Sequence, residues 1–140
     1  MRETGQPLGL QLALVSKAVS RAFNEALEQA GGSLPAWLIL TTLRDGACGA
    51  QREIAETIGI QGSTLTIHLD KLERAGLVVR ARDPQDRRNS QVELTRAGED
   101  AHTRLLQAVI AFNRRLRAGL SEEEIRLLRG LLTRLQANVS

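Results

Sequence analysis

Cysteine and aromatic residues are scarce in this chain of 140 residues. Its single cysteine, Cys48, excludes an internal disulfide framework, so the fold has to be held by a packed core. The only aromatic residues are Phe23, Trp37 and Phe112. The core must therefore consist of leucine, isoleucine, valine and alanine, a composition that suits helices.

Long hydrophobic runs are also absent. No stretch approaches the roughly 18 apolar residues that a membrane-spanning helix needs, and residues 1–7 carry no signal-peptide pattern. We therefore expect a cytoplasmic protein with no membrane partner.

Catalytic and metal-binding signatures are missing as well. The chain has no glycine-rich phosphate loop and no nucleophile elbow, and its two histidines, His68 and His102, are far apart in the sequence. Cys48 is too distant from both to complete a recognisable metal site. We expect no enzyme, no metal and no cofactor.

The charge is modest, at +3 with a pI of about 10.0. Of the 19 basic residues only Lys17 and Lys71 are lysines. The guanidinium of arginine can form two parallel hydrogen bonds to a phosphate or a guanine, which would suit a nucleic-acid partner. Arginine-rich chains also arise from genomic base composition, so the charge alone leaves both explanations open.

Apolar residues at intervals of three and four predict most of the secondary structure. They indicate a long amphipathic helix at residues 8–30, and Pro35 fits the first turn of a second helix that ends near residue 43. Two further helices are expected at residues 51–58 and 61–75, with Gly59 between them.

Two short antiparallel strands are predicted at residues 77–82 and 91–95, joined by a turn-rich basic loop. Helix, turn, helix and hairpin in this order indicate a winged helix-turn-helix at residues 34–97. Its second helix enters the major groove of DNA, and its wing reaches the flanking backbone or minor groove. The expected fold class is mainly α with a small β wing (α+β).

The segments on either side, residues 8–30 and 98–140, carry three apolar stripes that a small monomer cannot easily bury. Ser121 and Glu124 form a capping box at the start of the last helix. A second copy of the chain is the economical partner, so we expect N- and C-terminal dimerisation helices. A monomeric helical cap is the alternative.

The helix at residues 61–75 has two distinct sides. At about 100° per residue, Leu65, Leu69 and Leu72 share the side that should be buried. Hydroxyls on or beside the other side can reach base edges or phosphates. The predicted DNA contacts of this helix are Gln61, Ser63, Thr64, Thr66, Ile67 and Lys71.

Two further features concern DNA contact. Ile67 either is a tolerated exposed apolar residue or meets a thymine methyl group. At the tip of the wing, Asp86, Arg87 and Arg88 are predicted to contact DNA. An acidic neighbour can hold an arginine in one rotamer, which lowers the entropy cost of placing it in a narrow minor groove.

Residues 63–98, STLTIHLDKLERAGLVVRARDPQDRRNSQVELTRAG, resemble the most characteristic stretch of the MarR family of transcriptional regulators. The resemblance extends over nearly the whole chain. It implies an obligate homodimer that places two winged modules on a palindromic operator in double-stranded DNA, usually as a repressor. The matching elements are Leu72-Glu73, Gly76-Leu77-Val78, Asp86-Arg87-Arg88 and Leu94-Thr95 followed by Gly98.

The resemblance also assigns roles and marks departures. It implies that Arg88 enters the minor groove, oriented by Asp86. The family's usual basic residue in the middle of the reading helix is replaced by Ile67, so the base preference of relatives does not transfer. His68 occupies a position that is more often aliphatic.

Many members of the family are released from DNA by a small aromatic anion, and others by cysteine oxidation or by metal. The reactive cysteine usually lies near the start of the first helix, where this chain has none, so Cys48 is interpreted as a bystander. We expect His68 to line a pocket for an aromatic carboxylate, with Trp37 as its flat apolar wall. The alternative is a buried histidine bonded to a backbone carbonyl.

The function predicted from the sequence is therefore a sequence-specific regulator, released by a small-molecule effector. An architectural or weakly specific DNA-binding protein is the alternative. Competition with bulk DNA separates the two, because a regulator should prefer its operator by about 10³-fold or more.

Overall fold

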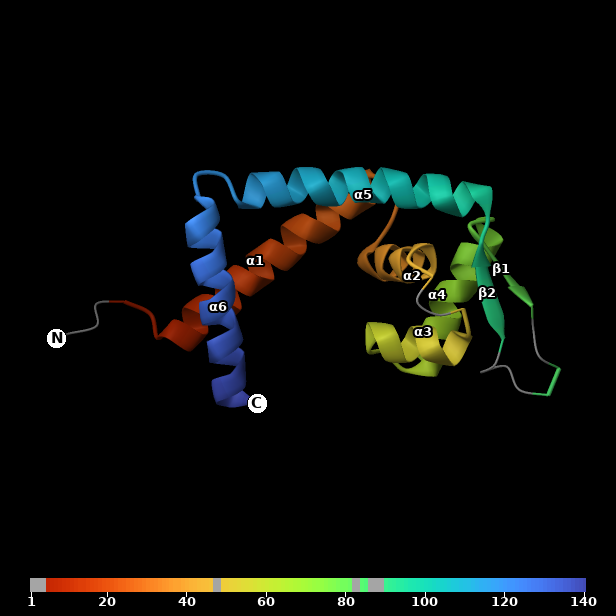
Figure 1. The fold of residues 1–140 in the computed structure, drawn as a ribbon, viewed down its shortest axis with the longest axis horizontal. Coiled ribbons are helices and arrows are strands. Elements are labelled where there is room, and N and C mark those ends of the chain that lie inside the picture. Colours follow the sequence, from red (N-terminus) through yellow and green to blue (C-terminus); the bar gives the residue numbers. More distant parts are fainter. Residues whose placement is uncertain (1–4, 47–48, 82–83, 86–89) are drawn as a thin grey trace. The chain divides into compact units, whose positions relative to one another are not determined.

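The computed structural model describes residues 5–46, 49–81, 84–85 and 90–140. Cys48 and the predicted wing contacts Asp86, Arg87 and Arg88 lie outside these residues. The predicted fold class, mainly α with a small β hairpin, is confirmed. Along the chain the elements are α1 (Leu8–Gln29), α2 (Leu34–Arg44), α3 (Gln51–Ile58), α4 (Gly62–Arg74), β1 (Val78–Ala81), β2 (Gln91–Leu94), α5 (Arg96–Leu116) and α6 (Glu122–Val139) (Figure 1).

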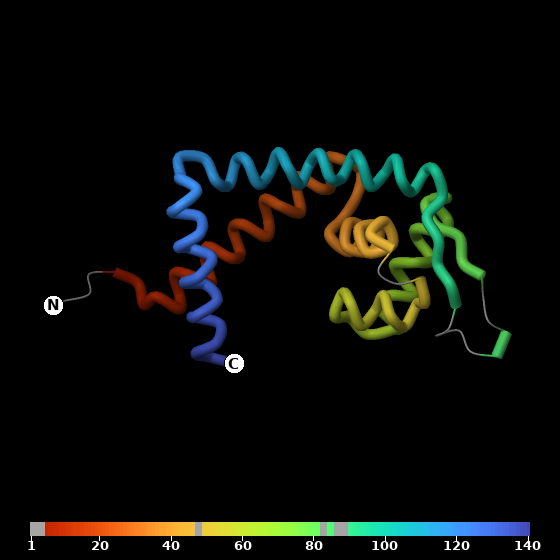
Figure 2. The backbone as a smooth tube through the Cα atoms, viewed as in Figure 1, coloured from red at the N-terminus to blue at the C-terminus, as the bar shows by residue number. Residues whose placement is uncertain are grey.

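The chain divides into two compact units, Met1–Val109 and Ile110–Ser140. The first contains α1 to β2 and most of α5, and the second contains the end of α5 and α6. Figure 2 follows the backbone through each unit. In the described ranges, no helix combines the length and apolar character needed to cross a lipid bilayer.

The core of the first unit lies where α2, α3 and α4 meet beside the β1–β2 hairpin (Figure 1). Leu65, Leu69 and Leu72 are buried there, as the helical spacing predicted. Full burial of one such side chain contributes roughly 1.5–3 kcal/mol. The side chains that are completely buried in this core are Leu27, Ile39, Leu40, Ile54, Leu65 and Leu69.

Local signals explain where α2 begins and where α3 ends. The Ser33 hydroxyl caps α2 by accepting a hydrogen bond from the Ala36 amide (3.2 Å), and Pro35 stands in the first turn. Gly59 ends α3 with a φ of +82°, which a residue without Cβ adopts at little cost. The chain then enters α4 directly and completes the helix-turn-helix.

The strands are shorter than predicted at their outer ends. The Leu77 amide donates to the Leu72 carbonyl (2.9 Å), so Leu77 closes the end of α4 and does not belong to β1. The Thr95 hydroxyl accepts a hydrogen bond from the Gly98 amide (3.0 Å), so Thr95 caps α5 and does not extend β2. Helix α4 also starts one residue later than predicted, because Gln61 occupies its N-cap position.

The hairpin pairs Arg80 with Val92 in antiparallel register. The segment before α3 makes an isolated antiparallel bridge to β2, between Ala50 and Gln91, which the sequence did not predict. The Val92 amide donates to the Gly49 carbonyl (2.7 Å), and the Gln51 amide donates to the Ser90 carbonyl (2.8 Å). The chain around the start of α3 is therefore hydrogen-bonded to the chain around the start of β2.

The second unit confirms the predicted capping box. The Ser121 hydroxyl accepts from the Glu124 amide (3.1 Å), and the Glu124 carboxylate accepts from the Ser121 amide (2.9 Å). Helix α6 buries none of its residues. Its most exposed leucines are Leu127, Leu128, Leu131 and Leu132.

Candidate nucleic-acid interface and effector cavity

Helix α4 presents a polar surface on the side away from its buried leucines. Ser63, Thr64, Ile67 and Lys71 are exposed, and so is Gln61 immediately before the helix. Ile67 is 57% exposed, which is high for a large apolar side chain in a structured helix. The predicted contact residues of the reading helix thus lie at the surface, with one exception.

Thr66 is the exception, because its hydroxyl is used inside the module. It donates to the Gly62 carbonyl (3.0 Å) and accepts from Gln51 Nε2 (2.7 Å). Gln51 is itself buried, with 8% of its surface exposed. The hydroxyl proton of Thr66 is therefore engaged within α4, and Thr66 helps to join α3 to α4. Residue types alone gave no signal for this pair.

Arg80 makes a second link to α4, which sequence reasoning missed. Its side chain is 5% exposed and its guanidinium contacts two carboxylates of α4, Asp70 and Glu73, the latter at 2.8 Å. Burial by itself lowers the pKa of Arg80, but hydrogen bonds and charges from Glu73 and Asp70 outweigh it and raise the pKa above its ordinary value. The guanidinium therefore stays charged.

His68 lines a cavity of about 360 Å³ in the first unit. Lys71 and Arg104 supply two more basic side chains, and no acidic residue is among the described residues that line it. The remaining wall is mostly apolar. Apart from the three basic residues, its lining consists of Gly31, Gly32, Ser33, Ala36, Leu40, Leu72, Ala75, Leu77, Ala101 and Leu105.

Trp37 does not line this cavity. Its ring stacks on His102 of α5, with ring centroids 5.2 Å apart and an interplanar angle of 13°. The sequence suggested Trp37 as an apolar wall beside His68, whereas in the structure it stacks on the other histidine. In the part of the chain that the structure describes, no three histidine, cysteine or acidic side chains gather as a metal-binding group.

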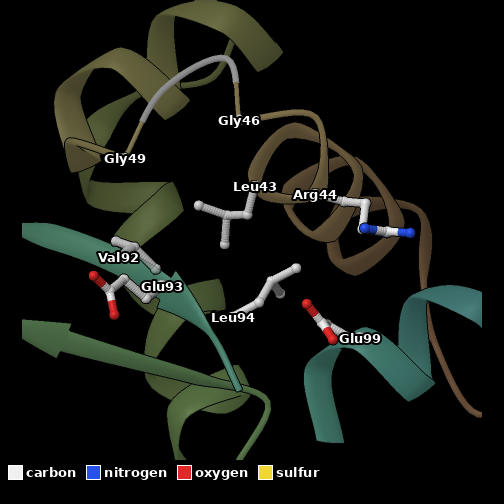
Figure 3. A pocket seen from close by; sticks show the side chains of 8 residues that line it. All are labelled: Leu43, Arg44, Gly46, Gly49, Val92, Glu93, Leu94 and Glu99. Atoms are coloured by element: carbon white, nitrogen blue, oxygen red, sulfur yellow. The ribbon is translucent and has the colours of Figure 1, made fainter. Parts of the chain in front are cut away.

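A second cavity, of about 430 Å³, has a different character (Figure 3). Leu43 and Leu94 lie near its middle, Arg44 and Glu99 to one side, and Glu93 to the other. With one cation and two carboxylates on its rim, this cavity offers an anion no net attraction. The cavity beside His68 is the better candidate for an anionic ligand.

Comparisons with known proteins agree with this arrangement. A model of the MarR family matches residues 33–90. The HTH-type transcriptional regulator SarZ of Staphylococcus epidermidis is 31% identical over 85 residues, which cover 61% of this chain and 57% of SarZ. The match therefore spans little more than half the length of that relative.

Solved structures match over much more of the chain. A MarR-family transcriptional regulator from Rhodococcus sp. RHA1 is 30% identical with a TM-score of 0.76, covering 94% of this chain and 96% of that one. A cysteine-to-serine mutant of MarR from E. coli, complexed with operator DNA, is 28% identical with a TM-score of 0.77, covering 92% and 93%. CouR from Rhodococcus jostii RHA1, bound to p-coumaroyl-CoA, is 30% identical with a TM-score of 0.73, covering 93% and 92%.

The fold of this chain is therefore shared over nearly the full length of these structures. The chain belongs to the MarR family of transcriptional regulators.

Proposed function

We propose that this protein is a homodimeric, sequence-specific DNA-binding regulator, acting as a repressor on a palindromic operator and released by a small aromatic anion. The observation that carries the proposal is the exposed side of α4. Ser63, Thr64 and Ile67 stand together at the surface, opposite the buried leucines that fix the helix to its module. A helix held in this way offers a rigid set of side chains to a major groove.

The relatives support a DNA partner over the enzymatic alternative. SarZ is a transcriptional regulator, and the E. coli MarR structure contains operator DNA. Nonspecific architectural binding would need only positive charge, whereas an exposed Ile67 among hydroxyls adds nothing to attraction by phosphates. Contact with a base would explain the exposure of Ile67, because its methyl groups can pack on a thymine methyl.

The test of DNA recognition compares two duplexes of equal length, one from upstream of the protein's own gene and one with the same bases scrambled. We expect preference for the first by about 10³-fold or more in a gel-shift assay, with a footprint of two half-sites roughly 10 base pairs apart. Ile67→Ala should weaken operator binding by roughly tenfold, since a lost base contact typically costs 1–3 kcal/mol.

Binding of the same variant to the scrambled duplex is the internal control and should not change. Equal affinity of the wild-type protein for both duplexes would instead favour the weakly specific, architectural alternative. An equal loss by Ile67→Ala on both duplexes would remove Ile67 from base recognition.

The cavity beside His68 supports the effector part of the proposal. A volume of about 360 Å³ is within the range of small-ligand sites, which start near 300 Å³. His68 and Arg104 offer hydrogen-bond donors to a carboxylate, and Leu40 and Leu105 offer an apolar wall to a ring. CouR, a similar solved structure, is bound to p-coumaroyl-CoA, which supports a small-molecule effector.

Salicylate, titrated against the operator complex, tests this assignment. Arg104→Met and His68→Leu should each raise the concentration needed for release, for Arg104→Met by about tenfold or more, because a hydrogen bond to a charged group is worth roughly 1.5–3 kcal/mol. Arg44→Met, in the other cavity, is the matched control and should leave release unchanged. If all three variants release like the wild type, the effector site is elsewhere.

A further inference from the structure

Arg80 connects the first strand of the wing to the reading helix. Its Nη2 lies 2.8 Å from Glu73 Oε1 and also contacts Asp70 Oδ1. The three side chains differ in exposure, at 5% for Arg80, 45% for Asp70 and 33% for Glu73. The cation is therefore buried behind the helix, while its two carboxylate partners reach the surface.

Both carboxylates occupy unfavourable positions for a DNA-reading helix. They lie in the second half of α4, where the helix dipole is negative and disfavours acidic side chains. In a major groove they would also approach phosphates that repel them. A counter-charge within the module removes both difficulties.

Burying the charge of Arg80 costs free energy, which argues that the ion pairs have a function. A guanidinium taken out of water loses several kcal/mol of hydration, which only well-placed partners restore. Arg80 Nε is buried without a hydrogen-bond partner in the described ranges, so the compensation comes from the Nη2 end that holds the carboxylates. For packing alone, an apolar residue of similar volume would serve at less cost.

We propose that Arg80 is a positioning residue of the DNA interface: it draws Asp70 and Glu73 against β1 and cancels their charge, so that α4 can approach the DNA backbone at a fixed angle to the wing. This inference rests on the proposed function. Arg80 acts through α4 and does not touch DNA itself, because its side chain is almost completely buried.

The experiment compares three proteins by operator affinity at about 50 to 200 mM salt: the wild type, Arg80→Met, and a neutral triad in which Arg80→Met is combined with Asp70→Asn and Glu73→Gln. Arg80→Met should bind roughly tenfold more weakly at the lowest salt, and this loss should shrink as salt screens the carboxylates of Asp70 and Glu73. The neutral triad should recover to within about threefold of the wild type, because the repulsive charges are gone.

Arg117→Met is the control for loss of an arginine charge. It breaks a more exposed Arg–Glu ion pair, in which Arg117 Nη2 lies 2.7 Å from Glu122 Oε1, in the second unit. Its operator affinity should equal that of the wild type. Thermal unfolding of every variant tests whether each is folded at the assay temperature.

Two results would overturn the proposal: Arg80→Met binding like the wild type, or a neutral triad as weak as Arg80→Met. If Arg80→Met does not fold, Arg80→Met with Asp70→Asn replaces it, and removal of the remaining Glu73 charge must then raise affinity. If the wild-type protein shows no preference for its upstream DNA, that result contradicts the proposed function instead. In that case amide hydrogen exchange tests whether Arg80 holds β1 against α4. The amides of β1 must exchange faster in Arg80→Met than in the neutral triad.

Discussion

His102 is the residue whose surroundings differ most from what its type suggests. It lies on α5, 7% exposed, with its imidazole stacked on the Trp37 indole. Burial lowers the pKa of His102, and the positive charge of Arg44 lowers it further, while Asp45 acts in the opposite direction. The folded protein therefore favours the neutral imidazole.

This environment predicts a loss of stability in mild acid. The unfolded chain takes up a proton near the ordinary histidine pKa of about 6.5, whereas the folded protein resists it to lower pH. The contribution of His102 is thus complete above that pH and is lost as the pH falls toward the lowered pKa. His102→Phe keeps the ring stack without the titration, so its free energy of unfolding should fall less than that of the wild type between about pH 7.5 and 5.

Urea unfolding at each pH measures the effect. His102→Gln separates the two roles of the side chain, because it removes both the stacking and the titration. It should be less stable than His102→Phe at every pH but equally insensitive to His102 protonation. A wild type and His102→Phe with parallel pH profiles would show that this imidazole does not contribute to acid sensitivity.

At the scale of the elements, the sequence predicted what depends on near neighbours. The bounds of α3, the glycine that ends it and the capping box of α6 agree with the structure, because periodicity and caps act over only a few residues. The same periodicity correctly placed Ser63 and Ile67 on the exposed side of α4. Their contact with DNA remains a prediction.

Contacts between separate elements could not be predicted in this way. Gln51 meets Thr66 across 15 residues of sequence, and Arg80 meets Asp70 across 10. Both pairs depend on how a helix or a strand packs on α4, which no periodicity encodes. For the same reason neither the place of Lys71 and Arg104 beside His68 nor the stacking of Trp37 on His102 was expected.

Gly98 shows how close packing between two elements can require a particular residue in the sequence. A Cβ at this position of α5 would lie 2.0 Å from the Leu77 carbonyl oxygen, far inside any tolerated contact. The start of α5 therefore passes directly over the exit from α4. The glycine that contributed to the family resemblance has a packing reason, independent of any contact with DNA.

For the whole molecule, the apolar surface is the outstanding feature. In the first unit, Leu8 and Val15 of α1 are 59% and 50% exposed. In the second, Leu127 and Leu128 of α6 are 64% and 46% exposed. Surfaces of this kind normally mark an association site, and a second copy of the chain, as in the proposed function, would bury them.

We expect the wild-type protein to sediment as a dimer at micromolar concentration. Leu128→Glu should weaken the dimer by at least about tenfold, because a charge buried at an apolar interface costs several kcal/mol. Operator binding should fall with it, since two modules are needed to engage both half-sites. Thr133→Glu adds the same charge at a polar position of α6 and is the control. A wild type that sediments as a monomer would contradict the dimer.

Lys71 has a place in both proposed sites, since it stands on the exposed part of the reading helix and also lines the cavity beside His68. An anion in the cavity and a phosphate of the DNA would draw on the same ammonium group. Two binding equilibria that are linked through a shared group are reciprocal. If the bound ligand lowers the affinity for DNA by some factor, bound DNA lowers the affinity for the ligand by the same factor. Protein bound to the operator would then take up the ligand at higher ligand concentrations than protein free of DNA.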